Sequence, residues 1–114
     1  MKEEQRIHRG DLYYADLRLT LGCEQGGVRP VVILQNNTGN LHSPTVIVAP
    51  ITGKKKRYLP THVNIEHPLL FKDSLVLLEQ IRTIDKCRLL SPMGRLDDEY
   101  ILRINKATEI SLGL

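Results

Sequence analysis

The apolar residues of this chain come in short runs, each followed by residues that favour turns, and this spacing constrains the fold more than any other feature. The longest uninterrupted runs of Leu, Ile, Val or Phe, at residues 31–34 and 75–78, have four residues each. Residues such as Pro30, Asn36 and Pro50 punctuate the chain between the runs. Short β-branched runs bounded by proline, glycine or asparagine predict strands rather than long helices.

We expect about five or six short strands, with a turn roughly every ten residues. The expected segments are residues 12–17, 31–35, 45–49, 61–65 and 74–83, with a shorter one near 88–95. Side chains alternate between the faces of a strand, which places Val63 and Ile65 on one face and His62 and Asn64 on the other. A tight turn is expected at residues 36–40, and Pro50 should end the third segment.

The last segment of the chain changes to a helical period. Ile101, Ile104 and Thr108 follow three-to-four spacing, and Asp97 precedes them as a suitable N-cap. The 114 residues are enough for one compact core and too few for two, so residues 1–114 are expected to form a single domain. The whole pattern predicts a mainly β fold with a C-terminal α-helix, arranged as a small, partly open β-barrel.

The sequence offers no signal for a membrane, an export route or a metal. No apolar run approaches the roughly 20 residues that a membrane-spanning helix needs, and residues 1–9 lack the apolar stretch of a secretory signal. We therefore expect a cytoplasmic protein in which Cys23 and Cys87 are unpaired thiols. The four histidines show no metal-ligand spacing, so no metal or other cofactor is expected.

Positive charge is concentrated in the middle of the chain. The net charge is only +3, but nine basic and four acidic residues lie between Lys54 and Arg95. The segment includes the basic run Lys54-Lys55-Lys56-Arg57. Such a segment is as typical of a solvated surface as of a surface that faces a polyanion, and charge alone does not separate the two.

Three segments carry side chains suited to chemistry on an anionic ligand. In the glycine-rich loop of residues 22–30, Glu24 can exchange a proton and Arg29 offers a forked cation that suits phosphate. Thr52 places a hydroxyl at the end of an expected strand. In residues 79–83, alternation puts Gln80 and Arg82 on one face and Glu79 on the other. Taken alone, the glycine-rich loop and Thr52 are more typical of an ordinary loop and strand end, and residues 79–83 are as typical of an exposed, salt-bridged strand.

Five motifs, in this order along the chain, resemble those of the MazF/PemK toxins of bacterial toxin–antitoxin systems. They are Arg9-Gly10-Asp11-Leu12-Tyr13, Glu24-Gln25-Gly26-Gly27-Val28-Arg29-Pro30, Ala49-Pro50-Ile51-Thr52, Leu59-Pro60-Thr61-His62-Val63 and the segment from Ser74 to Asp85. The resemblance runs from about Arg6 to the C-terminus, and the third to fifth motifs resemble the Gram-positive branch most closely.

The resemblance implies an SH3-like β-barrel that forms a homodimer and acts as a metal-independent, sequence-specific endoribonuclease on single-stranded mRNA. A cognate MazE-like antitoxin would block its RNA groove. Transferred residue by residue, the catalytic pair is Arg29 and Thr52, with Glu24 as a candidate general base. The residues expected to bind RNA are Gln25, Gly26, Gly27, Val28, Thr61, Glu79, Gln80 and Arg82. Cleavage would leave a cyclic phosphate and a 5′-hydroxyl, at a short site with an ACA core such as UACAU.

The chemistry of RNA self-cleavage explains why such residues would be needed. When a 2′-hydroxyl attacks its own phosphate, negative charge builds up on the phosphorane oxygens, and fixed donors stabilise it. We expect Arg29 to stabilise this charge and to act as a candidate acid for the leaving group, while Thr52 aligns the phosphate. The general base stays open between Glu24 and Arg29, although a carboxylate releases and accepts protons far more readily than a guanidinium.

One departure from the family pattern and one alternative function stand beside this interpretation. Cys23 occupies a position where the family usually has serine, and a thiol is a poorer hydrogen-bond donor than a hydroxyl. The basic run at residues 54–57 suits either RNA or an acidic antitoxin segment. The alternative to an enzyme is a non-catalytic toxin or binding module of the same fold, which would act by protein contact in the manner of a gyrase poison.

Overall fold

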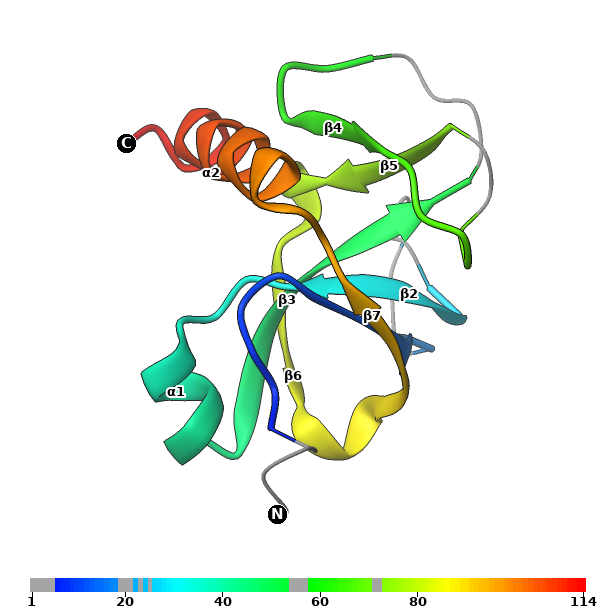
Figure 1. Ribbon diagram of the computed structural model, residues 1–114, viewed down its shortest axis with the longest axis vertical. Helices are drawn as coiled ribbons and strands as arrows, with labels where there is room; N and C mark the ends of the chain where they lie inside the picture. The colour runs from blue at the N-terminus through cyan, green and yellow to red at the C-terminus, as the bar shows by residue number, and fades with distance from the viewer. Residues whose placement is uncertain (1–5, 19–21, 23, 25, 54–57, 71–72) are drawn as a thin grey trace.

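Strands make up most of the described structure. The computed structural model describes residues 6–18, 22, 24, 26–53, 58–70 and 73–114. Its strands are β1 (Asp11–Asp16), β2 (Val28–Ile33), β3 (Thr45–Thr52), β4 (His62–Ile65), β5 (Ser74–Leu77), β6 (Arg82–Asp85) and β7 (Leu89–Arg95). Its helices are α1 (Asn37–His42) and α2 (Asp98–Leu112), with 3₁₀ turns η2 (Leu78–Gln80) and η3 (Lys86–Arg88) (Figure 1).

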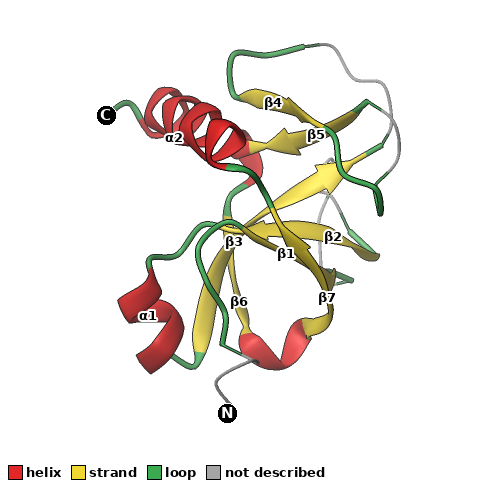
Figure 2. Ribbon diagram, in the orientation of Figure 1, coloured by secondary structure: helices red, strands yellow, loops and turns green. Residues whose placement is uncertain are grey.

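The strands pair antiparallel in the order β4-β5-β3-β2-β1-β7, and β6 pairs with β3 beside this path. Strand β3 joins the two parts of the molecule, because Thr45–Val48 pairs with β6 whereas Ile51 and Thr52 pair with β5 (Figure 2). Among the described residues, the outer strands β4 and β7 do not pair with each other. The mainly β, partly open barrel predicted from the sequence is therefore confirmed.

Two apolar clusters fill the interior on opposite faces of the β1–β2 ladder. Val32 belongs to the cluster that lies under α2, whereas Val31 and Ile33 belong to the other. Tyr13 and Tyr14 also pack against different clusters, as strand alternation requires. The strand predicted at residues 12–17 is confirmed as β1, and the one at 61–65 as β4.

Helix α2 closes the first cluster with its semi-apolar face. Ile104 and Ala107 are buried there, which confirms the predicted packing of the terminal helix on the β core. Asp97 is the N-cap by backbone conformation, but its carboxylate makes no capping hydrogen bond. The helix ends at Gly113, whose φ of 71° is a left-handed conformation that glycine adopts readily. None of the helices in the described part of the chain is long and apolar enough to cross a bilayer.

Strand β3 continues through Pro50, so the break predicted there is wrong. Leu34 donates to the carbonyl of Ile47 at 2.9 Å, and alternation along the ladder then makes Val31 and Pro50 a non-hydrogen-bonded pair. The nitrogen of Pro50 consequently faces away from β2, between the stretches of β3 that pair with β6 and β5. A residue without an N–H costs no ladder bond at such a position.

Two further expectations from the sequence are corrected. The turn predicted at residues 36–40 is the start of α1, because the Asn36 side chain caps the helix by accepting the Gly39 N–H at 2.8 Å. The single strand predicted at residues 74–83 is divided into β5, η2 and β6. Strand β5 pairs with β4 and with the end of β3, whereas β6 pairs with the beginning of β3. The chain must therefore turn between β5 and β6.

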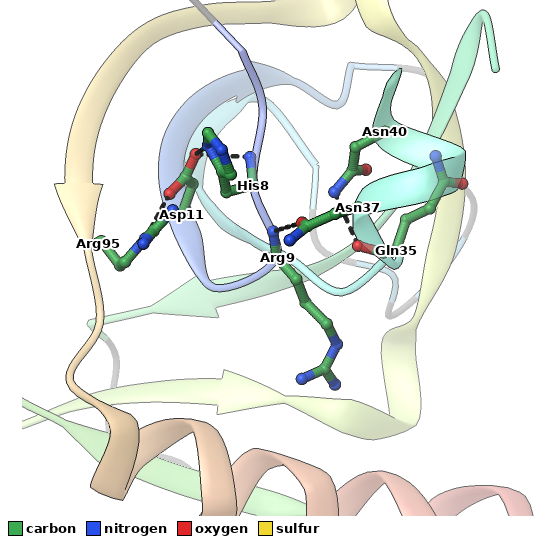
Figure 3. A network of polar contacts seen from close by, with 7 residues as sticks. All are labelled: His8, Arg9, Asp11, Gln35, Asn37, Asn40 and Arg95. Carbon is green, nitrogen blue, oxygen red and sulfur yellow. Dashed lines mark hydrogen bonds and ion pairs between the residues drawn. The ribbon is translucent and has the colours of Figure 1, made fainter. Parts of the chain in front are cut away.

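The tripeptide Arg9-Gly10-Asp11 is a structural junction (Figure 3). The Arg9 guanidinium donates to the carbonyl of Leu34 at 2.9 Å and to Asn105 on α2 at 2.8 Å. Gly10 has a φ of 90°, and a Cβ built there would lie 2.2 Å from the Cδ1 atom of Ile101. The backbone conformation favours glycine at this position, and a larger residue would also displace the end of the Ile101 side chain on α2.

Candidate active site

The β2–β3 ladder brings Arg29 and Thr52 to the same place. Val31 pairs with Pro50, so the same register extended by two residues sets Arg29 opposite Thr52. Both residues line one cavity of about 630 Å³. The structure thus unites the cation and the hydroxyl that the sequence resemblance assigned to catalysis.

The remaining walls of this cavity are largely apolar. They are formed by Tyr14, Val28, Pro30, Ile51, Gly53, Pro68, Leu69 and Leu70. A charged group beside apolar walls interacts more strongly with an anion than it would in open water, because the surroundings are less polarisable. The cavity therefore suits a phosphate held between the guanidinium of Arg29 and the hydroxyl of Thr52.

Both polar groups of the cavity are held in place. The Arg29 Nε–H donates to the carbonyl of Gly26 at 2.7 Å, which ties the side chain to its own loop. A guanidinium has five N–H donors, so this bond fixes the side chain without consuming its capacity to bind a phosphate. Thr52 is only 1% exposed, and its backbone is paired with Leu75 of β5.

A second, smaller cavity of about 200 Å³ collects the other expected site residues. Glu24, Glu79, Gln80 and Arg82 line it, together with Pro50 and Ile81. Pro50 and Thr52 are two residues apart on β3 and so lie on the same face of that strand. The two cavities therefore follow one another along β3.

The face assignment made from the sequence for residues 79–83 is wrong. It placed Glu79 opposite Gln80 and Arg82, but all three line the smaller cavity. The reason is that Glu79 and Gln80 belong to the 3₁₀ turn η2, where side chains do not alternate with a period of two.

Glu79 is bonded through both oxygens of its carboxylate. Its Oε1 accepts from the Thr61 hydroxyl at 3.1 Å, and its Oε2 lies 2.8 Å from Nε2 of His62. Burial raises the pKa of the Glu79 carboxyl, but hydrogen bonds from His62, the backbone and Thr61, together with the electrostatic attraction of His62, outweigh burial and hold that pKa below its usual value. Glu79 is therefore a carboxylate near neutral pH, and its charge faces the smaller cavity.

Sequence reasoning missed His62. The alternation of β4 placed it on a polar face with Asn64, yet His62 is 3% exposed while Asn64 is exposed. Its partner Glu79 lies 17 residues further along the chain. The only local signal was a histidine within a predicted strand, which does not indicate whether its side chain is buried or exposed.

The other predicted site residues are placed as follows. Val28 lines the larger cavity, and Gly26 accepts the bond from Arg29. Gly27 has a φ of 75°, a conformation that favours glycine. Gln25, Cys23 and the basic run at residues 54–57 lie outside the described residues.

The predictions of unpaired thiols and of no metal site do not concern the two cavities. Cys87 is a free, exposed thiol. The described residues contain no group of three His, Cys, Asp or Glu side chains that could hold a metal ion.

Comparisons with known proteins give a consistent result. Residues 8–112 match the family described as PemK-like, MazF-like toxin of type II toxin-antitoxin system. Endoribonuclease MazF of Staphylococcus saprophyticus is 57% identical over 111 residues, covering 95% of this chain and 92% of the relative.

Solved structures share the architecture. A mycobacterial endoribonuclease in complex with its cognate antitoxin matches with a TM-score of 0.80 at 28% identity, covering 95% of this chain and 96% of the other. MazF from Deinococcus radiodurans matches with a TM-score of 0.82 at 23% identity, covering 95% and 97%, and this match bears on the fold alone.

Proposed function

This chain belongs to the PemK-like, MazF-like family of type II toxins and is an endoribonuclease, and from that premise we propose that it cuts single-stranded mRNA without a metal, by attack of a 2′-hydroxyl on the adjacent phosphate. The relative from S. saprophyticus comes from a Gram-positive bacterium, in agreement with the branch that the motifs resemble. We also infer that residues 1–114 form one toxin domain, since the family match spans residues 8–112.

The observation that carries the catalytic proposal is the shared cavity of Arg29 and Thr52. In the reaction the 2′-oxygen forms a bond to phosphorus, and the bond from phosphorus to the 5′-oxygen breaks. A base takes the proton of the 2′-hydroxyl, and an acid supplies a proton to the 5′-oxygen. The products are a 2′,3′-cyclic phosphate and a 5′-hydroxyl.

Arg29 stabilises the negative charge of the phosphorane and supplies the acid for the leaving group. Donors fixed before the reaction, as Arg29 is by its bond to Gly26, stabilise such charge with little reorganisation. The Thr52 hydroxyl aligns the phosphate. The base is Glu24 or the neutral form of Arg29, which would pass the proton it takes from the 2′-oxygen to the 5′-oxygen. The pH–rate profile separates them, because the rate with a carboxylate base levels off above mildly acidic pH, whereas the rate with a guanidine base keeps rising through neutral pH.

The smaller cavity supplies recognition. Glu79 and Gln80 hold acceptors and donors against it, and Arg82 adds a cation, so unstacked bases and phosphates of a single strand fit its chemistry. Gln25, Gly26, Gly27 and Thr61 belong to the same proposed RNA surface. We propose a short recognition site with an ACA core, of which UACAU is one form.

Two protein partners complete the proposal. A solved relative is in complex with its cognate antitoxin, and a MazE-like antitoxin would inhibit this chain by covering the RNA surface. We propose that the toxin is a homodimer, so that two copies together form the RNA groove. Exposed apolar side chains on α2 and just after it support such an association; they are Leu102, Ile110 and Leu112 on the helix and Leu114 beyond it. Light scattering would then give twice the chain mass of 13.0 kDa.

One experiment tests the enzymatic proposal. The purified protein is incubated with a long single-stranded RNA in the presence of a chelator, and the 5′ ends of the fragments are sequenced. We expect discrete fragments whose 5′-hydroxyl ends map to one short ACA-containing site. Intact RNA would contradict the proposed reaction and favour action by protein contact, whereas fragments at unrelated sites would contradict only the proposed recognition sequence.

A further inference from the structure

We propose that His62 is a positioning residue of this endoribonuclease, whose imidazole holds the Glu79 carboxylate in one orientation at the smaller cavity without touching RNA itself. The inference rests on the proposed role of Glu79 in RNA binding. It concerns the one strongly buried histidine of the described structure, 3% exposed, which the reaction scheme above does not use.

The hydrogen bonds of His62 define the state of its ring. The backbone N–H of Leu59 donates to Nδ1 at 3.2 Å, so Nδ1 acts as an acceptor and carries no proton. The other ring nitrogen, Nε2, lies 2.8 Å from Oε2 of Glu79 and is the atom that can donate to the carboxylate. Both nitrogens of a buried ring are satisfied, and each bond orients the other.

The fold explains why Glu79 meets this donor. His62 pairs with Leu77 across the β4–β5 ladder, and the N–H of Leu78 donates to the carbonyl of Thr61 at 3.0 Å. The strand then gives way to η2, which turns Glu79 back over Thr61 and His62. Each carboxylate oxygen therefore accepts one bond from the segment that leads into β4.

Holding both oxygens has a consequence for recognition. A glutamate side chain that is already ordered loses less conformational entropy when it binds a base. A carboxylate oxygen retains a second lone pair after accepting one hydrogen bond, so Glu79 can still accept from the exocyclic amino group of adenine or cytosine. His62 thereby acts on the affinity for RNA and leaves the reacting phosphate to Arg29 and Thr52.

Two substitutions separate this role from simple core packing. In His62→Gln the amide nitrogen takes the place of Nε2, so the donor to Glu79 is kept and the acceptor for Leu59 is lost. In His62→Asn the amide oxygen takes the place of Nδ1, so the acceptor for Leu59 is kept and Glu79 loses its donor. The exposed neighbour Asn64, two residues along β4, provides the control Asn64→Ala.

The experiment measures KM and kcat for cleavage of a defined RNA, with thermal unfolding of each variant. We expect His62→Asn to raise KM by about tenfold, the usual effect of one charge-assisted hydrogen bond. His62→Gln should raise KM by less than about threefold. Neither should change kcat by more than about twofold, and Asn64→Ala should match the wild type. In a Glu79→Ala background, His62→Asn should cause no further rise in KM.

The opposite order of effects would overturn the proposal. If His62→Gln impairs binding more than His62→Asn does, or if His62→Asn raises KM equally in the Glu79→Ala background, His62 acts through the β4 backbone and not through Glu79. The proposal expects His62→Asn to keep the contact with Leu59. It would therefore also be contradicted if His62→Asn failed to fold while His62→Gln folded. Wild-type protein that leaves RNA intact would instead contradict the proposed function, which keeps the two failures distinct.

Discussion

The two cavities along β3 are built in different ways. In the larger one, Arg29 and Thr52 come from neighbouring strands and are brought together by the register of the β2–β3 ladder. In the smaller one, Glu79 belongs to a 3₁₀ turn and is held by side chains from a third segment of the chain.

This difference in construction predicts how each cavity should respond to substitutions. Residues placed by a strand register have their positions set by many backbone bonds, so a substitution there changes the chemistry and spares the geometry. Residues placed by a side-chain network depend on each partner, so their function can be altered from a distance. We therefore expect substitutions in the larger cavity to change kcat, and substitutions in the smaller cavity to change KM.

Arg29→Ala and Thr52→Ala should have the largest effects. Each removes a donor that the proposed transition state needs, and loss of one such donor usually lowers kcat by about 100- to 1,000-fold. We expect the midpoint of thermal unfolding to stay close to the wild-type value for Arg29→Ala, because this side chain lies at a cavity wall. Single-turnover cleavage with saturating enzyme measures the change in the chemical step directly.

Antitoxin binding serves as the control for these two variants. Both should still bind the cognate antitoxin, which would demonstrate that the surface is intact. Wild-type cleavage rates in either variant would show that the shared cavity is not the catalytic one. Thr52 is buried, so Thr52→Val provides a second variant that removes the hydroxyl while keeping the volume.

Glu79→Ala should have the next largest effect, and of a different kind. Removing a charged acceptor from the smaller cavity should raise KM for RNA by about tenfold and alter kcat by less than about threefold. Steady-state cleavage of a short RNA measures both constants. A loss confined to kcat would break the comparison, because the smaller cavity would then take part in the chemical step.

The burial of the strands was open to prediction for a physical reason. The apolar run around Val32 is buried on both faces, and Val63 and Ile65 are buried on the face that their alternation indicates. Arg29 and Thr52 lie in separate motifs, and their meeting was implied by family resemblance. The register that sets one opposite the other depends on pairing across the sheet, which no local pattern encodes.

The arrangement around Glu79 could not be predicted for a related reason. Residues 74–83 contain neither proline nor glycine, so the sequence predicts one continuous strand with alternating side chains through the residues that form η2. The break exists because β3 changes partners, which is a property of the whole sheet. The burial of His62 likewise follows from Glu79, a residue whose position the broken strand determines.

The acid side of the pH–stability curve gives a smaller test of the Glu79 network. The folded-state pKa of Glu79 is lowered relative to its unfolded value of about 4.3. Its contribution is thus present above that unfolded pKa and is lost as the pH falls through the folded pKa. Thermal unfolding should show wild type more stable than Glu79→Gln near neutral pH, by less than about 4 °C because the carboxylate is partly exposed.

The same two proteins, wild type and Glu79→Gln, provide a control at low pH. The difference in unfolding midpoint should shrink as the pH is lowered below about 4, because protonated glutamic acid and glutamine are both neutral. A difference that stays constant down to pH 2 would mean that the Glu79 charge contributes nothing to the stability of the network.

Cys23→Ser should have the smallest effect of all, less than about threefold on kcat/KM. Serine is the usual residue of the family at this position, and replacing a thiol by a hydroxyl would at most add one hydrogen bond. Contacts through the loop backbone are unaffected by the exchange of sulfur for oxygen. The exposed thiol of Cys87 provides a matched control in Cys87→Ser. A 100-fold loss of kcat/KM in Cys23→Ser, without a loss in Cys87→Ser, would show that the Cys23 thiol takes part in cleavage. The proposed assignment of chemistry to the larger cavity and recognition to the smaller one would then have to include Cys23.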